Sequence, residues 1–303
     1  MILTVSLNPA VDKTCEIESL KPGEVNRLLQ VESVPGGKAV NVTKVLRQFK
    51  LPVMAVGFLG GNAGEFIEEG LEAQGVLCCF TRIAGDTRTN SNVVAADGSV
   101  TELLEPGPEI SEKELENFRK QFRGCLEQCE WVILSGSVPG GVPADIYREL
   151  IEECHAFGCR VILDSSGEAL RQGILAKPDL VKPNQKELEY LAGKSLDTEE
   201  KIKKAMQQLC DKTGGEVVVS LGAEGLLALS AKQKNEYWKQ AARQVEAVNT
   251  VGCGDTVVAS LCMSRIAGEK PEIMLRKAAA LAAANATTRE NGIIPMETYL
   301  ELL

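Results

Sequence analysis

A glycine turn that leads into an apolar stretch carries the clearest chemical signal in this sequence. The turn is Asn249-Thr-Val-Gly-Cys-Gly-Asp255, and the apolar stretch after it runs to Met263. Gly252 and Gly254 let the backbone expose its N–H groups, and the first turn of a helix leaves its own N–H groups without intrahelical partners. With the positive end of the helix dipole, these groups predict an anion-binding site.

Asp255, at the mouth of that site, allows two interpretations. A carboxylate repels a bound phosphate, so its presence makes sense if it acts on a proton beside the phosphate, as the base for an attacking hydroxyl. Aspartate is also a common N-cap after a glycine turn. The residues alone leave both interpretations open.

A second glycine cluster, Pro35-Gly-Gly-Lys-Ala-Val-Asn41, also precedes a helical pattern. Gly36 and Gly37 would let the backbone approach a ligand closely. Lys38 supplies a positive charge, and Asn41 both donates and accepts hydrogen bonds. The alternative is an ordinary turn before a helix, with the lysine in solvent.

Neither of two common nucleotide-binding fingerprints is present. At Gly37-Lys38, Glu32 stands where a Walker loop needs its first glycine, and Ala39 stands where Ser or Thr belongs. No GxGxxG opens a helix after a strand, so a dinucleotide fingerprint is absent as well.

Composition narrows the class of protein. The chain has 303 residues, of which 44% are hydrophobic and 25% charged, as in ordinary globular proteins. Forty-two acidic residues against 33 basic ones give a net charge of −9, which argues against nucleic acid as the main partner. No apolar stretch approaches the ~20 residues that span a bilayer, and the first residues resemble a core strand and not a signal peptide. We therefore expect a cytoplasmic protein that has no membrane partner.

Ten cysteines and one histidine do not form a recognisable metal set. The cysteine pairs lack CxxC spacing, and His155 alone cannot complete a Cys/His site. Most cysteines lie in apolar patterns, which favours free buried thiols. His155 precedes a strand and fits the end of a helix.

Helical and strand patterns alternate along most of the chain, which predicts a mainly parallel sheet covered by helices on both faces. The expected strands are Ile2–Leu7, Val53–Phe58, Trp131–Ser135, Arg160–Asp164, Leu180–Lys182 and Glu216–Leu221. The expected helices are Val40–Phe49, Glu65–Gln74, Glu112–Cys129, Ala144–Phe157, Lys186–Ala192, Thr198–Lys212, Thr256–Ala267 and Ile273–Thr287.

Two stretches, 11–34 and 87–104, interrupt this alternation. The second resembles two strands joined at Ala96-Asp-Gly98, a typical hairpin sequence. We expect both stretches to form a small β lid, with 1–10, 35–86 and 105–303 as the α/β core.

Six ordered motifs together resemble the ribokinase-like carbohydrate kinases, the pfkB group, over essentially the whole chain. The branch most similar contains 1-phosphofructokinase, tagatose-6-phosphate kinase and a minor 6-phosphofructokinase. The motifs are Asn8-Pro-Ala-Val-Asp12, Gly36-Gly-Lys38 with Asn41, Ser135-Gly-Ser-Val-Pro139, Asp164-Ser-Ser-Gly-Glu168, Val181-Lys-Pro-Asn-Gln-Lys-Glu187 and Gly252-Cys-Gly-Asp255.

The resemblance implies a three-layer α/β/α core with a β lid over the sugar site. It implies that Asp255 is the base, and that Gly252, Cys253 and Gly254 form the anion hole. Cys253 replaces the usual Ala or Ser, and its place near a helix N-terminus is a setting that lowers the pKa of a thiol.

The resemblance also assigns ligand contacts. The acceptor sugar would be bound by Asp12, Gly36, Gly37, Asn41 and Ser137, and its phosphate by Lys38 and Arg88, with Arg27 as a weaker candidate. ATP would lie near Lys182, Asn184, Ser220, Gly222, Gly225 and Asn285. Asn184 and Glu187 would hold Mg²⁺ largely through water, although Glu187 also fits a solvated first-turn residue.

These expectations combine into one hypothesis: transfer of a phosphoryl group from ATP to a ketohexose phosphate. Fructose 1-phosphate is the first choice, followed by tagatose 6-phosphate and fructose 6-phosphate. The rivals are a nucleoside kinase and a non-catalytic sugar-phosphate sensor. Exposed apolar faces on a projecting lid would favour a homodimer formed lid to lid.

Overall fold

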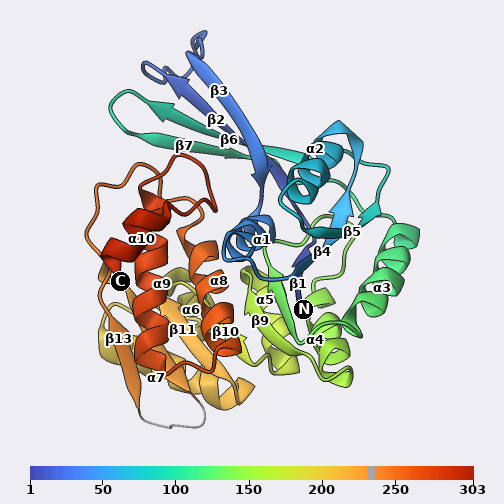
Figure 1. Cartoon of the computed structure of the whole chain (residues 1–303), viewed down its shortest axis with the longest axis vertical. Coiled ribbons are helices and arrows are strands. Elements are labelled where there is room, and N and C mark those ends of the chain that lie inside the picture. Colours follow the sequence, from blue (N-terminus) through green and yellow to red (C-terminus); the bar gives the residue numbers. More distant parts are fainter. Residues whose placement is uncertain (231–235) are drawn as a thin grey trace.

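The computed structural model, which describes residues 1–230 and 236–303, is built on a nine-stranded central sheet (Figure 1). Seven neighbouring strands are parallel, and the last two at one edge are antiparallel. In spatial order the strands are β13 (Tyr237–Gln240), β12 (Leu226–Ser230), β11 (Glu216–Ser220), β10 (Leu180–Val181), β9 (Arg160–Asp164), β8 (Trp131–Ser135), β1 (Ile2–Ser6), β4 (Val53–Leu59) and β5 (Leu77–Arg82).

Helices cover both faces of this sheet because its central strands are apolar on both sides. Neighbouring residues of β1 enter different cores: Leu3 packs with one set of helices and Ile2 with the other. The first set is α3 (Glu112–Leu126), α4 (Ile146–Ala156), α5 (Gly167–Gly173), α6 (Gln185–Ala192) and α7 (Glu199–Thr213). The second is α1 (Lys38–Gln48), α8 (Cys253–Ile266), α9 (Pro271–Ala286) and α10 (Met296–Leu302). The expected three-layer α/β/α arrangement is confirmed.

A separate four-stranded sheet projects from this body (Figure 1). Its order is β3 (Gln30–Gly36), β2 (Ala10–Ile17), β6 (Arg88–Ala95) and β7 (Val100–Leu104). Gly98, with φ at 82°, forms the turn between β6 and β7, and its N–H donates to the Ala95 carbonyl. The expected small sheet and its hairpin are therefore present, and we call this sheet the lid.

Several elements differ from the expected ones. Helices α1 and α8 begin two and three residues earlier, at Lys38 and Cys253, because glycines 37 and 252 adopt positive φ and end the preceding turns there. Helix α2 (Gly61–Glu72) likewise begins early. Sequence periodicity missed the two edge strands β5 and β13 and the strand β12 next to β13. It also missed the seven-residue helices α5 and α10, which are too short to show a clear period.

The remaining expectations can be checked directly. All ten cysteines are free, and His155 lies in the last turn of α4, with its Nε2 3.4 Å from Asp179 Oδ2. Within the described residues, no helix is both long and apolar enough to cross a membrane.

The backbones of β4 and β1 approach each other closely at the end of β1, just before the chain enters the lid. Gly57 in β4 has φ at 150°, and a Cβ atom there would lie 1.8 Å from the Ser6 carbonyl oxygen. Because that oxygen belongs to the backbone of a central strand, moving it away would cost free energy by distorting the sheet.

We predict that Gly57→Ala destabilises the protein by about 3 kcal/mol or more, since strain and overpacking combine at this position. Urea unfolding measures the change. Gly124→Ala, in a helix with open space around its Cβ, is the matched control and should stabilise by ~0.5–1 kcal/mol. Equal stability of the Gly57 variant and the wild type would contradict the proposed steric role.

Candidate active site

A cavity of about 260 Å³ lies between the lid and the carboxyl ends of the central strands. Its lining residues come from seven separate segments of the chain. It adjoins a wider hollow of about 690 Å³, and Glu102 and Val251 line both. Its polar lining includes Asn8, Asp12, Gly37, Lys38, Asn41, Arg88, Asn90, Asn92, Ser135, Ser137, Ser166 and Asp255.

Asp255 is one of two buried acids that line this cavity, the other being Asp12. Asp255 lies in the first turn of α8, is 6% exposed, and accepts a hydrogen bond of 2.9 Å at Oδ2 from Asn41 Nδ2. Burial raises the pKa of Asp255 to about 7; Asp164 adds to this rise, while Lys38, Lys182 and the Asn41 hydrogen bond oppose it. A carboxyl group with a pKa near neutrality can accept a proton and release it at physiological pH.

The turn before Asp255 has the shape of an anion site. Gly252 is the N-cap of α8 in the left-handed region, with φ at 82°, so the first-turn N–H groups lie at the open end of the helix. The Cys253 N–H makes only a long contact of 3.4 Å, with the Thr250 carbonyl. A Cβ atom on Gly254 would lie 3.8 Å from Lys182 Nζ, so a positive charge lies next to this turn.

The thiol of Cys253 differs from expectation. Its Sγ contacts the Ala282 carbonyl at 3.3 Å and receives a 3.6 Å contact from Asn285 Nδ2. Burial raises the pKa of the Cys253 thiol, and nearby Asp255 raises it further, whereas the contact from Asn285 lowers it. The expectation that the helix N-terminus would lower this pKa is wrong because the sulfur points into the protein.

Asn285 supports the same turn from behind. Its side chain is 1% exposed, donates to the Val251 carbonyl at 3.1 Å and accepts from the Gly292 N–H at 2.9 Å. Since both ends of the amide are occupied, Asn285 holds the backbone of this turn, and its assignment to the nucleotide stays a prediction.

Asp164, to which the sequence analysis assigned no role, forms ion pairs with two lysines. It ends strand β9, is 1% exposed, and lies 3.0 Å from Lys182 Nζ and 3.5 Å from Lys38 Nζ. Burial alone would raise the pKa of Asp164, but Lys182 and Lys38 outweigh it and hold the pKa below the usual value. Asp164 in turn raises the pKa of Lys38. Lys38 therefore stays charged beside Asp255, and the Lys182 ammonium group lies on the other side of Asp164.

Glu187 and Asn184 form a capping box at the start of α6. The Asn184 side chain accepts from the Glu187 N–H at 2.9 Å, and Glu187 Oε2 accepts from the Asn184 N–H at 2.8 Å. The second oxygen, Oε1, faces Lys38 Nζ at 3.9 Å. Glu187 is thus a capping residue with one carboxylate oxygen directed towards the charged cluster.

The oxygen atoms of this cluster fit a magnesium ion that keeps most of its waters better than one coordinated by protein side chains alone. In the part of the chain that the structure describes, no group of three or more His, Cys, Asp or Glu side chains could hold a metal. Magnesium usually takes one or two carboxylates and keeps several waters when it also binds phosphates. Glu187 Oε1, whose shortest ion-pair contact is 3.9 Å long, suits that partial role, with Asp164 close by.

Asp12 occupies the lid end of the cavity. Its Oδ1 accepts from Asn90 Nδ2 at 3.1 Å and its Oδ2 from Asn291 Nδ2 at 3.3 Å. A Cβ atom on Gly36 would lie 2.1 Å from Asp12 Oδ2, so the glycine is needed to seat this carboxylate. Asn90 and Asn291 were both missed as candidate residues; Asn90 lies two residues after Arg88, whereas no local signal indicates Asn291.

Arg88 is fixed by carbonyl groups and keeps part of its donor capacity. Nε and Nη2 donate to the Asn8 carbonyl at 3.2 and 3.0 Å, and Nη1 donates to the Glu105 carbonyl at 2.9 Å. A guanidinium has five N–H donors, so two remain, one on each Nη, and Arg88 lines the cavity. Nearby, Ser137 accepts from Asn8 Nδ2 at 3.2 Å.

The other candidates lie outside the cavity lining. Arg27 is exposed in the lid between β2 and β3. Ser220 ends β11, and its N–H donates to the Pro183 carbonyl, beside Asn184. Gly222 opens a short 3₁₀ turn, and Gly225, with φ at 99°, ends it. A Cβ atom on Gly225 would lie 2.0 Å from the Gln240 carbonyl oxygen, so only glycine fits there.

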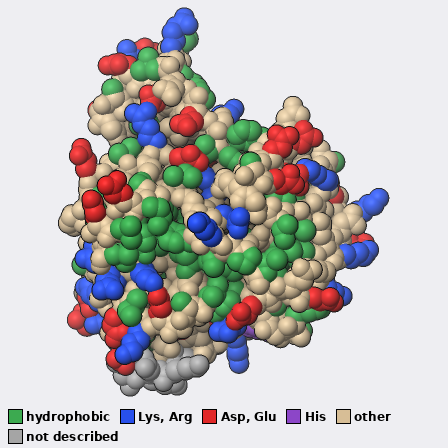
Figure 2. Space-filling model, in the orientation of Figure 1, with side chains coloured by type: hydrophobic (Ala, Val, Ile, Leu, Met, Phe, Trp, Pro, Cys, Tyr) green, Lys and Arg blue, Asp and Glu red, His purple; other side chains and the backbone are tan. Residues whose placement is uncertain are grey.

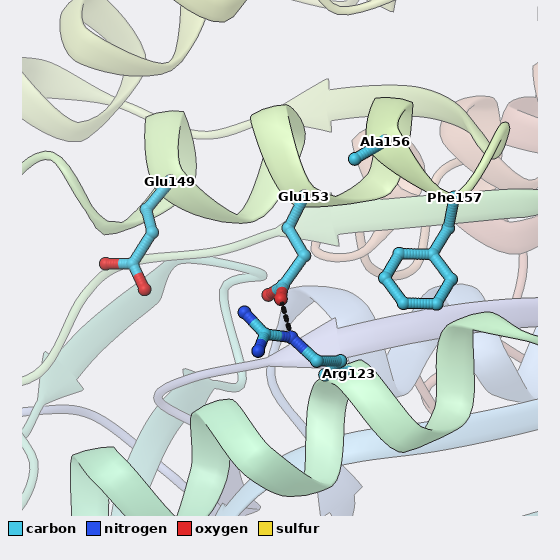
Figure 3. A pocket seen from close by; sticks show the side chains of 5 residues that line it. All are labelled: Arg123, Glu149, Glu153, Ala156 and Phe157. Atoms are coloured by element: carbon cyan, nitrogen blue, oxygen red, sulfur yellow. Dashed lines mark hydrogen bonds and ion pairs between the residues drawn. The ribbon is translucent and has the colours of Figure 1, made fainter.

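A second groove, between α3 and α4, does not compete with this site. It has a volume of about 450 Å³ and is lined by Arg123, Glu149, Glu153, Ala156 and Phe157 (Figure 3). Arg123 pairs with Glu153 in the groove, and Arg119 forms two hydrogen bonds with Glu149. Its charges are therefore satisfied by one another.

Comparisons with known proteins agree with this geometry. The profile of the pfkB family carbohydrate kinases matches residues 5–298. Phosphofructokinase-2 from Escherichia coli, in a structure with potassium, is 27% identical with a TM-score of 0.91, covering 99% of this chain and 97% of its own. A possible 1-phosphofructokinase from Thermotoga maritima is 26% identical with a TM-score of 0.88, covering 99% and 96%.

A more distant structure resembles the fold alone. Arabidopsis thaliana ribokinase, in complex with ribose and ATP, is 24% identical with a TM-score of 0.76, covering 99% of this chain and 97% of its own. The family match spans nearly the whole chain, and the cavity places a buried acid beside an anion site and two lysines. On these grounds the chain belongs to the pfkB family of carbohydrate kinases.

Proposed function

We propose that this protein phosphorylates a ketohexose phosphate with ATP, and that its acceptor is fructose 1-phosphate, giving fructose 1,6-bisphosphate. The observation that carries the proposal is the position of Asp255, a buried acid with a pKa near 7 at the anion-binding end of α8. A sugar-phosphate sensor would need no such base, which disfavours a non-catalytic role.

The chemistry follows from these residues. Asp255 accepts the proton of the sugar hydroxyl, whose oxygen forms a bond to the γ-phosphorus as the bond from that phosphorus to the bridging oxygen of ADP breaks. The first-turn N–H groups of Cys253 and Gly254 and the ammonium groups of Lys38 and Lys182 stabilise the charge on the transferring group. Magnesium, when bound near Glu187 and Asp164, supplies further neutralisation of the phosphates.

The two remaining N–H donors of Arg88 suit the phosphate that the acceptor already carries. We assign Lys38 to that phosphate only secondarily, because its ammonium group is drawn towards Asp164 and Glu187. A nucleoside, which has no phosphate, would leave Arg88 without a role, and this disfavours a nucleoside kinase.

The choice among ketohexose phosphates rests on the sequence. The segments Thr87–Asn90 and Thr101–Pro108 resemble 1-phosphofructokinases more than tagatose-6-phosphate kinases. The similar solved structures include both a phosphofructokinase-2 and a possible 1-phosphofructokinase, at nearly equal identity. Tagatose 6-phosphate and fructose 6-phosphate are therefore the alternatives, and kcat/KM over the three acceptors decides among them.

Asp255→Asn tests the base. The amide keeps the size of the side chain and the contact with Asn41 but cannot take a proton, so kcat should fall ~10²–10⁴-fold while both substrates still bind. Steady-state kinetics with calorimetric binding of the sugar phosphate measures both. Retention of more than a tenth of the wild-type turnover would refute the assignment.

Arg88→Ala tests the acceptor phosphate. Hydrogen bonds to charged groups contribute roughly 1.5–3 kcal/mol each, so KM for the sugar phosphate should rise by at least ~10-fold while KM for ATP changes little. Arg82→Ala, an exposed arginine paired with Glu68 outside the cavity, is the control. Equal use of free fructose and its phosphates by the wild type would show that no phosphate site exists.

We also propose a homodimer formed through the lids. Of the 18 large hydrophobic side chains that are exposed among the described residues, eight lie in the lid: Leu20, Val25, Leu28, Leu29, Val31, Val100, Leu103 and Leu104. Figure 2 shows charges of both signs beside apolar side chains on this projecting part. Burial of such a face against a second copy would remove it from water.

Light scattering at micromolar concentration, with sugar phosphate present, tests this assembly. We predict a dimer for the wild type. The double substitution Leu29→Asp and Leu104→Asp, which places charge on the exposed face, should give a monomer. A monomeric wild type would contradict the proposal.

A further inference from the structure

Helix α1 presents polar side chains at positions 38, 41, 44 and 48, which lie on one face of a helix because they repeat every three or four residues. The first two, Lys38 and Asn41, reach the active-site cavity. The other two, Lys44 and Gln48, contact the segment between α9 and α10. One helix face thus joins the catalytic site to a distant part of the chain.

Lys44 is completely buried. Its ammonium group donates to the Asn291 carbonyl at 2.6 Å and to the Pro35 carbonyl at 3.4 Å, and it lies 3.0 Å from Glu290 Oε1. Burial lowers the pKa of Lys44, while Glu290 and Asp12 oppose that change. An apolar side chain would avoid the cost of burying a charge, so core packing alone does not explain a lysine here.

Gln48 and Asn285 hold the same segment. Gln48 Nε2 donates to the Gly292 carbonyl at 2.6 Å, and Gln48 Oε1 accepts from the Ile294 N–H at 2.9 Å. Asn285 Oδ1 accepts from the Gly292 N–H. Gly292 has φ at 72°, and a Cβ atom there would lie 3.0 Å from the Asn41 carbonyl. The backbone at 290–294 is therefore fixed closely against α1.

This segment carries Asn291, whose side chain joins the two ends of the active site. Its Nδ2 donates to Asp12 Oδ2 at 3.3 Å, and its Oδ1 accepts from Asn249 Nδ2 at 2.9 Å. Asn249 begins the turn that leads to the anion site, and a Cβ atom on Gly252 would lie 3.3 Å from Asn291 Cβ. The direction of the Asp12 carboxylate therefore depends on where the Asn291 backbone lies.

We propose that Lys44 is a positioning residue for the acceptor: its buried ammonium group fixes the Asn291 backbone, so that the Asn291 amide orients Asp12 towards the sugar. The inference rests on the proposed function in one respect, the assignment of Asp12 to the acceptor. It adds two residues, Lys44 and Asn291, to those that determine acceptor binding.

Lys44→Met tests the inference because it keeps the length of the side chain and removes the charge. We expect KM for the sugar phosphate to rise about 10-fold, the effect of losing one hydrogen bond to a charged group, and KM for ATP to stay within about 2-fold. Val45→Ala is the matched control, since it removes apolar packing from the buried face of the same helix and keeps the Lys44 and Gln48 hydrogen bonds to residues 290–294. It should leave both Michaelis constants unchanged.

A double-mutant cycle separates positioning from general loss of structure. Asn291→Ala alone should also raise KM for the sugar phosphate, and Lys44→Met with Asn291→Ala should be no worse than the more damaging single change, because both act on Asp12 by one route. Additive effects would overturn the proposal. An unchanged sugar-phosphate KM in Lys44→Met, or an equal rise in both Michaelis constants, would also overturn it.

Two further measurements keep the test decisive if Lys44→Met does not fold. Glu290→Gln keeps an acceptor for Lys44 but removes the charge, and the Glu290 side chain is 35% exposed, so this variant should fold. KM for the sugar phosphate should then rise on the order of 3-fold, and no change would contradict the inference. Wild-type protein that neither binds nor phosphorylates a ketohexose phosphate would refute the proposed function instead, before any variant is compared.

Discussion

The proposed active site depends on the balance of charge around one buried carboxylate. Asp255 is removed from water, which favours its neutral form, yet Lys38 and Lys182 lie close enough to favour the ionised form. Those lysines are themselves held by Asp164, which is also buried and stays ionised between them. The outcome is an acid with a pKa near 7, neither permanently protonated nor permanently charged. Such a group can take a proton from a sugar hydroxyl at neutral pH.

The fold brings these charges together through the ends of its parallel strands. Asp164 ends β9, Lys182 follows β10, and the chain leaving β1 carries Asp12 into the lid. Helices α1 and α8 then supply Lys38 and Asp255 from their first turns. Two glycines with positive φ, Gly37 and Gly252, set where those helices begin. Small changes in the backbone at these two positions would therefore move Lys38 and Asp255, the two groups that we propose act in the reaction.

Local patterns in the sequence predicted much of this arrangement. The glycine turns, the alternation of strands and helices and the hairpin of the lid all reflect interactions between residues that are near one another in the chain. What local patterns could not predict are contacts between distant residues: Lys44 meets Asn291 across 247 positions, and Asn41 meets Asp255 across 214. The thiol of Cys253 shows the same limit, because its neighbourhood in the sequence favours a lowered pKa, whereas burial in the folded chain raises it.

The pH dependence of kcat/KM for the sugar phosphate, measured for the wild type and Lys38→Met, tests the account most directly. If Asp255 is the base, its active form is ionised, so kcat/KM should fall as the pH drops through about 7. Removal of the Lys38 charge disfavours that form and should shift the midpoint to higher pH. Ionisation of the acceptor phosphate, near pH ~6, gives a midpoint that the Lys38 substitution does not move. A midpoint equal in both proteins would therefore contradict the assignment of Asp255 as the base.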